Sequence, residues 1–166
     1  MIFLEYDLLQ AFENIITDQP VQLAIVGDGT LKETVLQAER DVPGVRALGR
    51  LADDALLDTY FAADVAVLPS HFEPWGLVVN EAMAAGLPVI VSDRVGCAAD
   101  LIHSGETGLI FPAGHVEGLE NAMLRLMSDR PLRERMSKNA RRLISGWTLE
   151  NEARIITSTW DALISR

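Results

Sequence analysis

Two glutamates, Glu73 and Glu81, stand eight positions apart near the middle of the chain. A short apolar run at residues 65–68 precedes them, and a second one at residues 89–91 follows, as is typical of two buried strands. Residues 77–85, between these runs, are predicted to form a helix. The sequence therefore predicts a strand–loop–helix–strand unit, with Glu73 in its loop and Glu81 on the second turn of its helix.

The start of this helix is suited to an anion, because its first N–H groups have no partner within the helix and its dipole is positive there. We predict that the N–H groups of Gly76, Leu77 and Val78 bind a diphosphate. Helical side chains lean toward the N-terminus, which brings the Glu81 carboxylate near the same place. Carboxylates accept hydrogen bonds from adjacent hydroxyls, and a sugar nucleotide carries hydroxyl pairs on both sides of its diphosphate. Glu73 is predicted to hold the sugar and Glu81 the ribose.

The same stretch resembles a known family signature. Residues 73–84, EPWGLVVNEAMA, resemble the Glu-x7-Glu motif of retaining GT-B glycosyltransferases, the glycosyltransferase group 1 or glycogen-synthase-like family. The resemblance extends over about residues 5–165. It implies transfer of a sugar from a nucleotide diphosphate donor with retention of configuration, without a metal ion or other cofactor. It also implies that Trp75, where Phe is more usual, and Gly76 line the sugar pocket together with Glu73.

Gly27, Asp28 and Gly29 follow a predicted strand at residues 21–26 and form a second turn. A dinucleotide-binding fingerprint needs a further glycine where this chain has Lys32, so the pattern gives little support to NAD binding. A tight turn between a strand and a helix explains the two glycines equally well. The resemblance implies that this turn lies on the cleft side of the nucleotide site.

Leu48, Gly49 and Arg50 lie at the end of another predicted strand, residues 45–49. The resemblance implies that this segment runs beside the nucleotide base and offers it backbone hydrogen bonds. Arg50 is also a candidate cation for the donor phosphates. The alternative is that Arg50 is simply solvated, as exposed arginines usually are.

The first residues of the chain depart from the family pattern. In the family, this domain begins with a strand that ends in a Gly-Arg-Leu loop, followed by Lys-Gly. Here Leu4 and Glu5 stand where Lys-Gly would fall, and the Gly-Arg-Leu loop is absent. Because the family's Arg and Lys bind the diphosphate, we expect weak donor binding. We also expect residues 1–166 to lack the first strand of the domain and its partner, the N-terminal acceptor-binding domain.

The composition excludes other classes of function. The chain has 166 residues, 49% of them apolar and 23% charged, which suits one globular domain with a core of its own. Its 24 acidic and 14 basic residues give a net charge of −10, which argues against a nucleic-acid-binding surface. The sequence shows no transmembrane segment and no signal peptide, and we expect a cytoplasmic location.

Cys97 is the only cysteine, so the chain has no internal disulfide, and no Cys–His spacing marks it as a nucleophile. We predict that Cys97 is a buried apolar residue. His71, His103 and His115 do not form a metal-binding pattern, and an Asp-x-Asp motif is absent. The metal-dependent class of glycosyltransferases is therefore disfavoured. His71, beside the glutamate loop, is predicted either to orient that loop or to be structural.

The pattern as a whole predicts an α/β fold, with a doubly wound, parallel, Rossmann-like sheet of about five strands flanked by helices. We treat residues 1–166 as a single nucleotide-sugar-binding domain. Asp53 is predicted to cap the helix after the second strand. The five strands are expected at or near Val21, Val45, Val65, Val89 and Gly108.

Three helices are predicted to end the chain, at about residues 115–128, 131–145 and 148–165. Ile156 and Trp160 lie on an apolar face of the last helix. Two placements of this helix stay open: against the core of its own domain, or across to the partner domain as in two-domain GT-B enzymes. An apolar surface left without its partner promotes association, so self-association through this face is expected.

Two other functions remain open. The missing Arg and Lys favour, for residues 1–166 taken alone, a non-catalytic sugar-nucleotide-binding or interaction module. A sugar-nucleotide epimerase-like domain on the same fold is the second alternative, although the EAMA segment at residues 81–84 is less typical of it. The pattern names neither the nucleotide nor the sugar nor the acceptor.

Overall fold

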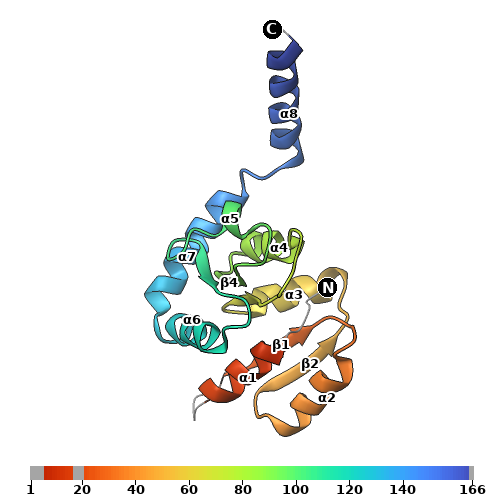
Figure 1. Ribbon diagram of the computed structural model, residues 1–166, viewed down its shortest axis with the longest axis vertical. Helices are drawn as coiled ribbons and strands as arrows, with labels where there is room; N and C mark the ends of the chain where they lie inside the picture. Colours follow the sequence, from red (N-terminus) through yellow and green to blue (C-terminus); the bar gives the residue numbers. More distant parts are fainter. Residues whose placement is uncertain (1–5, 17–20, 165–166) are drawn as a thin grey trace.

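The computed structural model describes residues 6–16 and 21–164, which form an α/β domain with a projecting C-terminal helix (Figure 1). None of the helices in these residues is long and apolar enough to cross a membrane. The elements, in chain order, are α1 (Tyr6–Ile15), β1 (Leu23–Val26), α2 (Lys32–Asp41), β2 (Val45–Gly49), α3 (Asp53–Ala62), β3 (Ala66–Leu68), α4 (Leu77–Ala85), β4 (Val89–Ser92), α5 (Ala98–Leu101), β5 (Gly108–Phe111), α6 (Val116–Ser128), α7 (Arg130–Ile144) and α8 (Leu149–Ile164).

The five strands pair in parallel, as predicted, but they are divided between two sheets. β1 pairs with β2, and β3, β4 and β5 pair in that order. The expectation of one continuous sheet therefore needs correction, since no strand pair joins β1 to β3 in the part of the chain that the structure describes. In the common doubly wound order, the strand that precedes the first helix lies between these two groups. The described residues begin at that helix.

One hydrophobic cluster spans both sheets and makes them a single domain. It includes Phe12 on α1, Val45 on β2, Ile90 on β4 and Leu126 on α6, all of which are almost fully buried. Each such side chain contributes about 1.5–3 kcal/mol when it is fully buried. A second cluster, which includes Leu68 and several residues of α4 and α5, lies beneath α4. This second cluster packs α4 against β3 and β4.

Both ends of α4 are set by glycines with a left-handed backbone. Gly76 has φ 96° at its N-terminus and Gly86 has φ 86° at its C-terminus. Arg141 on α7 lies directly against Gly86, and its Nη2 donates to Ala85 O at 2.7 Å. A Cβ at position 86 would lie 2.0 Å from Arg141 Nε, in a backbone conformation that itself favours glycine.

The predicted helix boundaries are mostly confirmed. Asp129 caps α7, because its Oδ1 accepts from Leu132 N at 2.8 Å. The prediction for Asp53 is wrong: the N-cap of α3 is Ala52, and Asp53 is a helical residue with φ 50°. The sequence does not predict the short helix α5, because four residues are too few to show helical periodicity.

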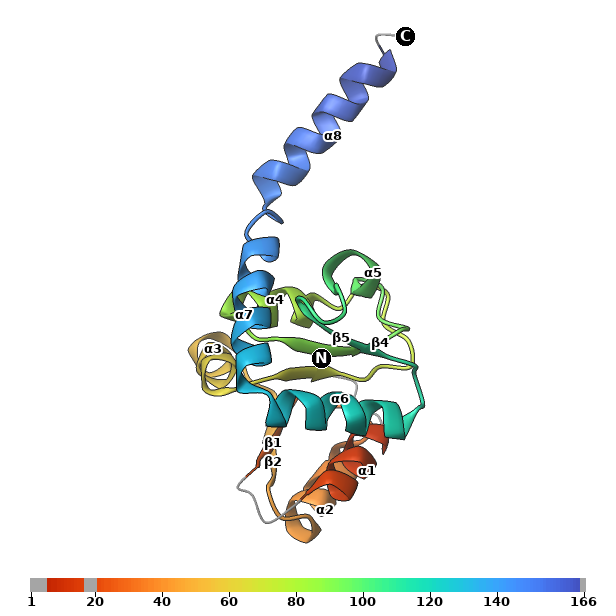
Figure 2. The same ribbon diagram turned by 90° about the vertical axis from the view of Figure 1, so that its left-hand side faces the viewer.

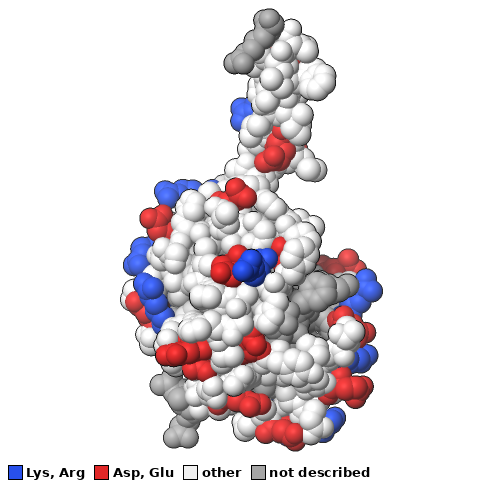
Figure 3. Space-filling view, viewed as in Figure 1, with Lys and Arg blue, Asp and Glu red and all other residues white. Residues whose placement is uncertain are grey.

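Helix α8 extends away from the rest of the domain in both views (Figures 1 and 2). None of its residues is buried, so of the two placements left open, packing against the core of its own domain is not the one observed. Most of its surface is uncharged on the face shown in Figure 3. Its exposed apolar side chains are Leu149, Ile155, Ile156, Trp160, Leu163 and Ile164.

We expect self-association through α8, because an apolar surface of this kind gains free energy when a second surface covers it. Trp160→Glu is expected to weaken association about tenfold or more, equivalent to about 1.4 kcal/mol or more. Ser158→Glu is the matched control, since it adds the same charge to the same helix at an exposed polar position on the side away from Trp160. Sedimentation across a range of concentrations measures both variants. A wild-type monomer at every concentration would contradict the prediction.

Candidate functional site

Residues 71–76, called here the Glu73 loop, follow β3 and lie against the segment that connects β4 to α5. Glu73 N donates to Arg94 O at 3.2 Å, and Gly96 N donates to Glu73 O at 2.8 Å. Cys97 N donates to Trp75 O at 2.9 Å. These bonds hold the loop parallel to residues 94–97, so the backbone of Glu73 has one defined position.

Two glycines allow this close approach. A Cβ at Gly96 would lie 2.0 Å from Pro74 O, closer than any atom can come without moving the backbone. A Cβ at Gly76 would lie 3.1 Å from side-chain atoms of Leu68 and Val95, in a backbone conformation that favours glycine. The loop therefore depends on glycine at both positions.

The N-terminus of α4 has the form that an anion site requires. Gly76 is the N-cap residue, and its carbonyl accepts from Val79 N at 2.8 Å. The N–H groups of Leu77 and Val78 have no acceptor within the helix, because the first turn of a helix never provides one. Leu77 is exposed. The predicted diphosphate site at Gly76, Leu77 and Val78 thus has the necessary backbone geometry, while phosphate binding itself stays a prediction.

The side chain of Trp75 is engaged within the protein. Its Nε1 donates to Asn80 Oδ1 at 3.1 Å, and its ring centroid lies 5.6 Å from that of Trp147. The Trp75 backbone N–H donates to Glu73 Oε1 at 3.3 Å, which orients that half-buried carboxylate. Because the indole N–H and the ring already have partners, only the backbone or the ring edge of Trp75 is available for a sugar contact. Glu73 remains the main candidate for binding the sugar.

Tyr60 on α3 contacts Glu81 on α4, which the sequence does not predict. Tyr60 Oη donates to Glu81 Oε2 at 2.9 Å. Burial raises the pKa of Tyr60 well above its ordinary value, and the hydrogen bond and the negative charge of Glu81 raise it further. The phenol thus keeps its proton at neutral pH. No signal in the sequence identifies this pair, because the two residues lie on different helices.

Two of the predicted nucleotide segments meet at the β1–β2 sheet. Gly27 N donates to Gly49 O at 2.7 Å, which joins the turn after β1 to the end of β2. Asp28 Oδ1 accepts from Gly29 N at 3.0 Å. A pocket of about 420 Å³ lies beside this junction. It is lined by Ile25, Val26, Gly27, Asp28, Gly29, Thr30, Leu31, Lys32, Val35, Leu36, Ala47, Leu48 and Gly49.

The structure does not place every predicted site residue in one pocket. Leu48 and Gly49 line the pocket at the β1–β2 sheet, whereas Arg50 is not among its lining residues. Glu73 and Glu81 are also outside it, because they follow β3 of the other sheet. The predicted base-binding and sugar-binding segments are thus positioned by different sheets.

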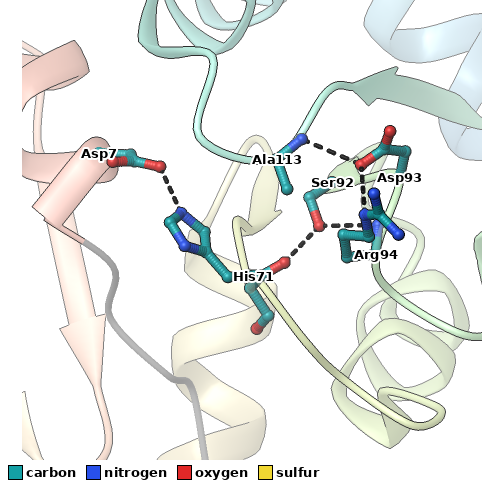
Figure 4. Close-up of polar contacts among 7 residues, drawn as sticks. Asp7, His71, Ser92, Asp93, Arg94 and Ala113 are labelled. Atoms are coloured by element: carbon teal, nitrogen blue, oxygen red, sulfur yellow. Dashed lines mark hydrogen bonds and ion pairs between the residues drawn. The ribbon is translucent and has the colours of Figure 1, made fainter.

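His71 connects the Glu73 loop to α1. Its Nε2 lies 2.7 Å from Asp7 Oδ2, and Figure 4 shows the two side chains facing one another. Ser92 Oγ donates to Ser70 O, immediately before the loop, and Arg94 N donates to Ser92 Oγ at 3.2 Å. The loop is therefore attached to both α1 and β4, and His71 has the partner that an orienting role requires.

Cys97 is fully buried, as predicted. Burial raises the pKa of its thiol to about 11, so the thiol is protonated at neutral pH and is a poor nucleophile. Its Sγ lies 3.9 Å from Gly76 O, beneath the start of α4. Within residues 6–16 and 21–164, no three His, Cys, Asp or Glu side chains gather as metal ligands do.

Comparison with known proteins identifies the family. The family model described as glycosyl transferases group 1 matches residues 6–143, and the chain belongs to this family. The sulfoquinovosyl transferase SQD2 of Arabidopsis thaliana is 37% identical over 137 residues, which make up 80% of this chain and 26% of that protein. The chain thus spans about a quarter of the length of this curated relative.

Solved structures agree with the fold and the family. Anabaena HepE in complex with UDP-glucose has a TM-score of 0.80 and 26% identity, over 95% of this chain and 45% of that chain. The C-terminal domain of a glycosyl transferase group 1 family protein (LpcC) from Francisella tularensis has a TM-score of 0.71 and 25% identity, over 84% and 76% respectively. The predicted fold, that of the C-terminal domain of a GT-B glycosyltransferase, is confirmed.

Proposed function

We propose that this chain is the donor-binding domain of a retaining glycosyltransferase that uses a nucleotide diphosphate sugar and needs no metal ion. The observation that carries this proposal is the N-terminus of α4, which is capped by Gly76 and lies between Glu73 and Glu81 in the chain. A helix N-terminus attracts a diphosphate, and a carboxylate on each side suits the hydroxyl groups of a sugar and a ribose. The UDP-glucose bound by HepE, a protein of similar fold, supports this choice of ligand.

In this proposal the protein stabilises the leaving group. As the bond between the sugar C1 and the phosphate oxygen breaks, negative charge grows on the nucleoside diphosphate. The N–H groups of Gly76, Leu77 and Val78 and the dipole of α4 offset that charge. Glu73 holds sugar hydroxyls and Glu81 holds the ribose. The acceptor oxygen bonds to C1 on the same face, and its proton passes to the departing phosphate, so neither glutamate is a general base.

The base of the nucleotide is proposed to lie along Leu48, Gly49 and Arg50, beside the turn formed by Gly27 and Gly29. Arg50 is exposed and offers a positive charge near the donor phosphates. Donor binding by residues 1–166 alone is expected to be weak, because the family's Arg and Lys are not found near Leu4. The proposed partner is an acceptor-binding domain, consistent with the greater length of the relatives.

We expect that the purified chain binds a sugar nucleotide but transfers no sugar to an acceptor, because one domain supplies only one side of the reaction cleft. Thermal scanning with a panel of UDP-, GDP- and ADP-sugars identifies the donor, and adding EDTA tests the proposed independence from metal ions. A sugar-transfer assay then compares the wild type with Glu81→Ala. Acceptor-dependent turnover above that control would contradict the expectation, and loss of donor binding in EDTA would contradict metal independence.

A further inference from the structure

The contact between Tyr60 and Glu81 involves only one oxygen of the carboxylate. Tyr60 Oη donates to Glu81 Oε2 at 2.9 Å. Glu81 Oε1 accepts no hydrogen bond from any residue whose structure is described. An ionised carboxylate has about four acceptor sites, two on each oxygen. Tyr60 therefore occupies one site and leaves the whole of Oε1 and one site on Oε2 for a ligand.

The ring of Tyr60 is held more firmly than the side chain it contacts. Tyr60 is half-buried and packs against the hydrophobic cluster beneath α4. Its backbone carbonyl accepts from Ala63 N at 3.2 Å, where α3 ends. Glu81, in contrast, is exposed on the surface of α4 and has several rotatable bonds. The hydrogen bond from the fixed phenol thus selects one orientation of a side chain that otherwise has many.

The phenol can only donate in this contact, because a carboxylate without its proton only accepts. The raised pKa of Tyr60, caused first by burial, keeps that donor proton in place. Tyr60 therefore contributes only a donor to this contact and leaves the acceptor positions on Glu81 Oε1 for a pair of hydroxyls.

We propose that Tyr60 is a positioning residue for ribose binding: it holds Glu81 through Oε2 and leaves Oε1 for the 2′ and 3′ hydroxyls of the nucleotide. This inference rests on the proposed function of Glu81. It predicts that the hydroxyl of Tyr60 affects the affinity for a ribonucleotide and has no effect on a nucleotide that lacks both ribose hydroxyls.

The test uses calorimetry with UDP, GDP and ADP, followed by the 2′,3′-dideoxy analogue of the one that binds most tightly. Tyr60→Phe is expected to lower the affinity for the ribonucleotide about threefold to tenfold, which is the effect of losing one hydrogen bond that orients a charged group. The same substitution is expected to leave the affinity for the dideoxy analogue unchanged. In a Glu81→Gln background, Tyr60→Phe is expected to cause much less further loss. Tyr6→Phe is the matched control, because Tyr6 is the only other tyrosine and is exposed.

Each outcome decides the question. If Glu81→Gln loses no ribonucleotide affinity, the proposed role of Glu81 is wrong, and the inference about Tyr60 is then wrong as well. If Glu81→Gln loses affinity but Tyr60→Phe does not, only the inference about Tyr60 is wrong. If Tyr60→Phe loses equal affinity for the ribonucleotide and for its dideoxy analogue, Tyr60 is a structural residue. Circular dichroism checks that the variant folds. A Tyr60→Phe chain that does not fold would likewise make Tyr60 structural and overturn the inference.

Discussion

Glu81→Ala is expected to weaken the binding of any nucleoside diphosphate about tenfold to a hundredfold. The substitution removes the carboxylate that is proposed to accept from the ribose hydroxyls, and hydrogen bonds to a charged group contribute roughly 1.5–3 kcal/mol. Each 1.4 kcal/mol corresponds to about tenfold in affinity. The exposed position of Glu81 means that its loss costs little stability, so the effect should appear in binding and not in folding.

Glu73→Ala should behave differently, because Glu73 is proposed to contact the sugar. We expect Glu73→Ala to lower the affinity for a sugar nucleotide and to leave the affinity for the bare nucleoside diphosphate nearly unchanged. Calorimetry of both variants against both ligands makes the comparison, with circular dichroism to confirm folding. Equal losses on the two ligands for Glu73→Ala, or no loss for Glu81→Ala, would show that the two glutamates do not hold opposite ends of the donor.

Gly96→Ala is the second substitution with a large expected effect. The new Cβ would lie 2.0 Å from Pro74 O, and neither group belongs to a side chain that can rotate away. The Glu73 loop must therefore move, which breaks the bond from Gly96 N to Glu73 O. Overpacking of this kind costs about 1–3 kcal/mol. For a domain of this size, we expect the melting temperature to fall by several degrees and donor affinity to fall at least tenfold.

Gly146→Ala is the control for this substitution. The Cβ of an alanine there would meet only Leu143 O, at an ordinary distance of 3.5 Å. Thermal melting and donor titration of the two variants side by side separate a general cost of losing glycine from the specific clash at Pro74. If Gly96→Ala melts and binds like the wild type, the loop is not held as the structure indicates.

The elements of the site can be predicted from the sequence because they depend on local patterns. The helix predicted at residues 77–85 has the bounds of α4 in the structure. Glycine at position 76 marks its start, and the apolar runs on either side mark β3 and β4. The parallel α/β fold follows from the alternation of strands and helices, and the signature around Glu73 and Glu81 indicates the family that the comparisons confirm.

Contacts between distant segments cannot be predicted in this way. Tyr60 and Glu81 are 21 positions apart, and His71 and Asp7 are 64 apart, so neither pair has a sequence spacing that indicates contact. Each pair meets only because helices pack at particular angles against the strands. The contact between Trp75 and Trp147 has the same origin, since one ring comes from the Glu73 loop and the other from the segment between α7 and α8.

The same difference between local and long-range interactions explains why the sheet is divided and why α8 is exposed. Apolar runs identify strands, but the pairing of β1 and β3 depends on what lies between them in space, and the five strands form two sheets. Helical periodicity correctly predicts the apolar face of α8, which includes Ile156 and Trp160. Helical periodicity shows that a helix has an apolar face. Which other element packs against that face depends on the arrangement of the whole domain. Here the described part of the domain leaves that face exposed.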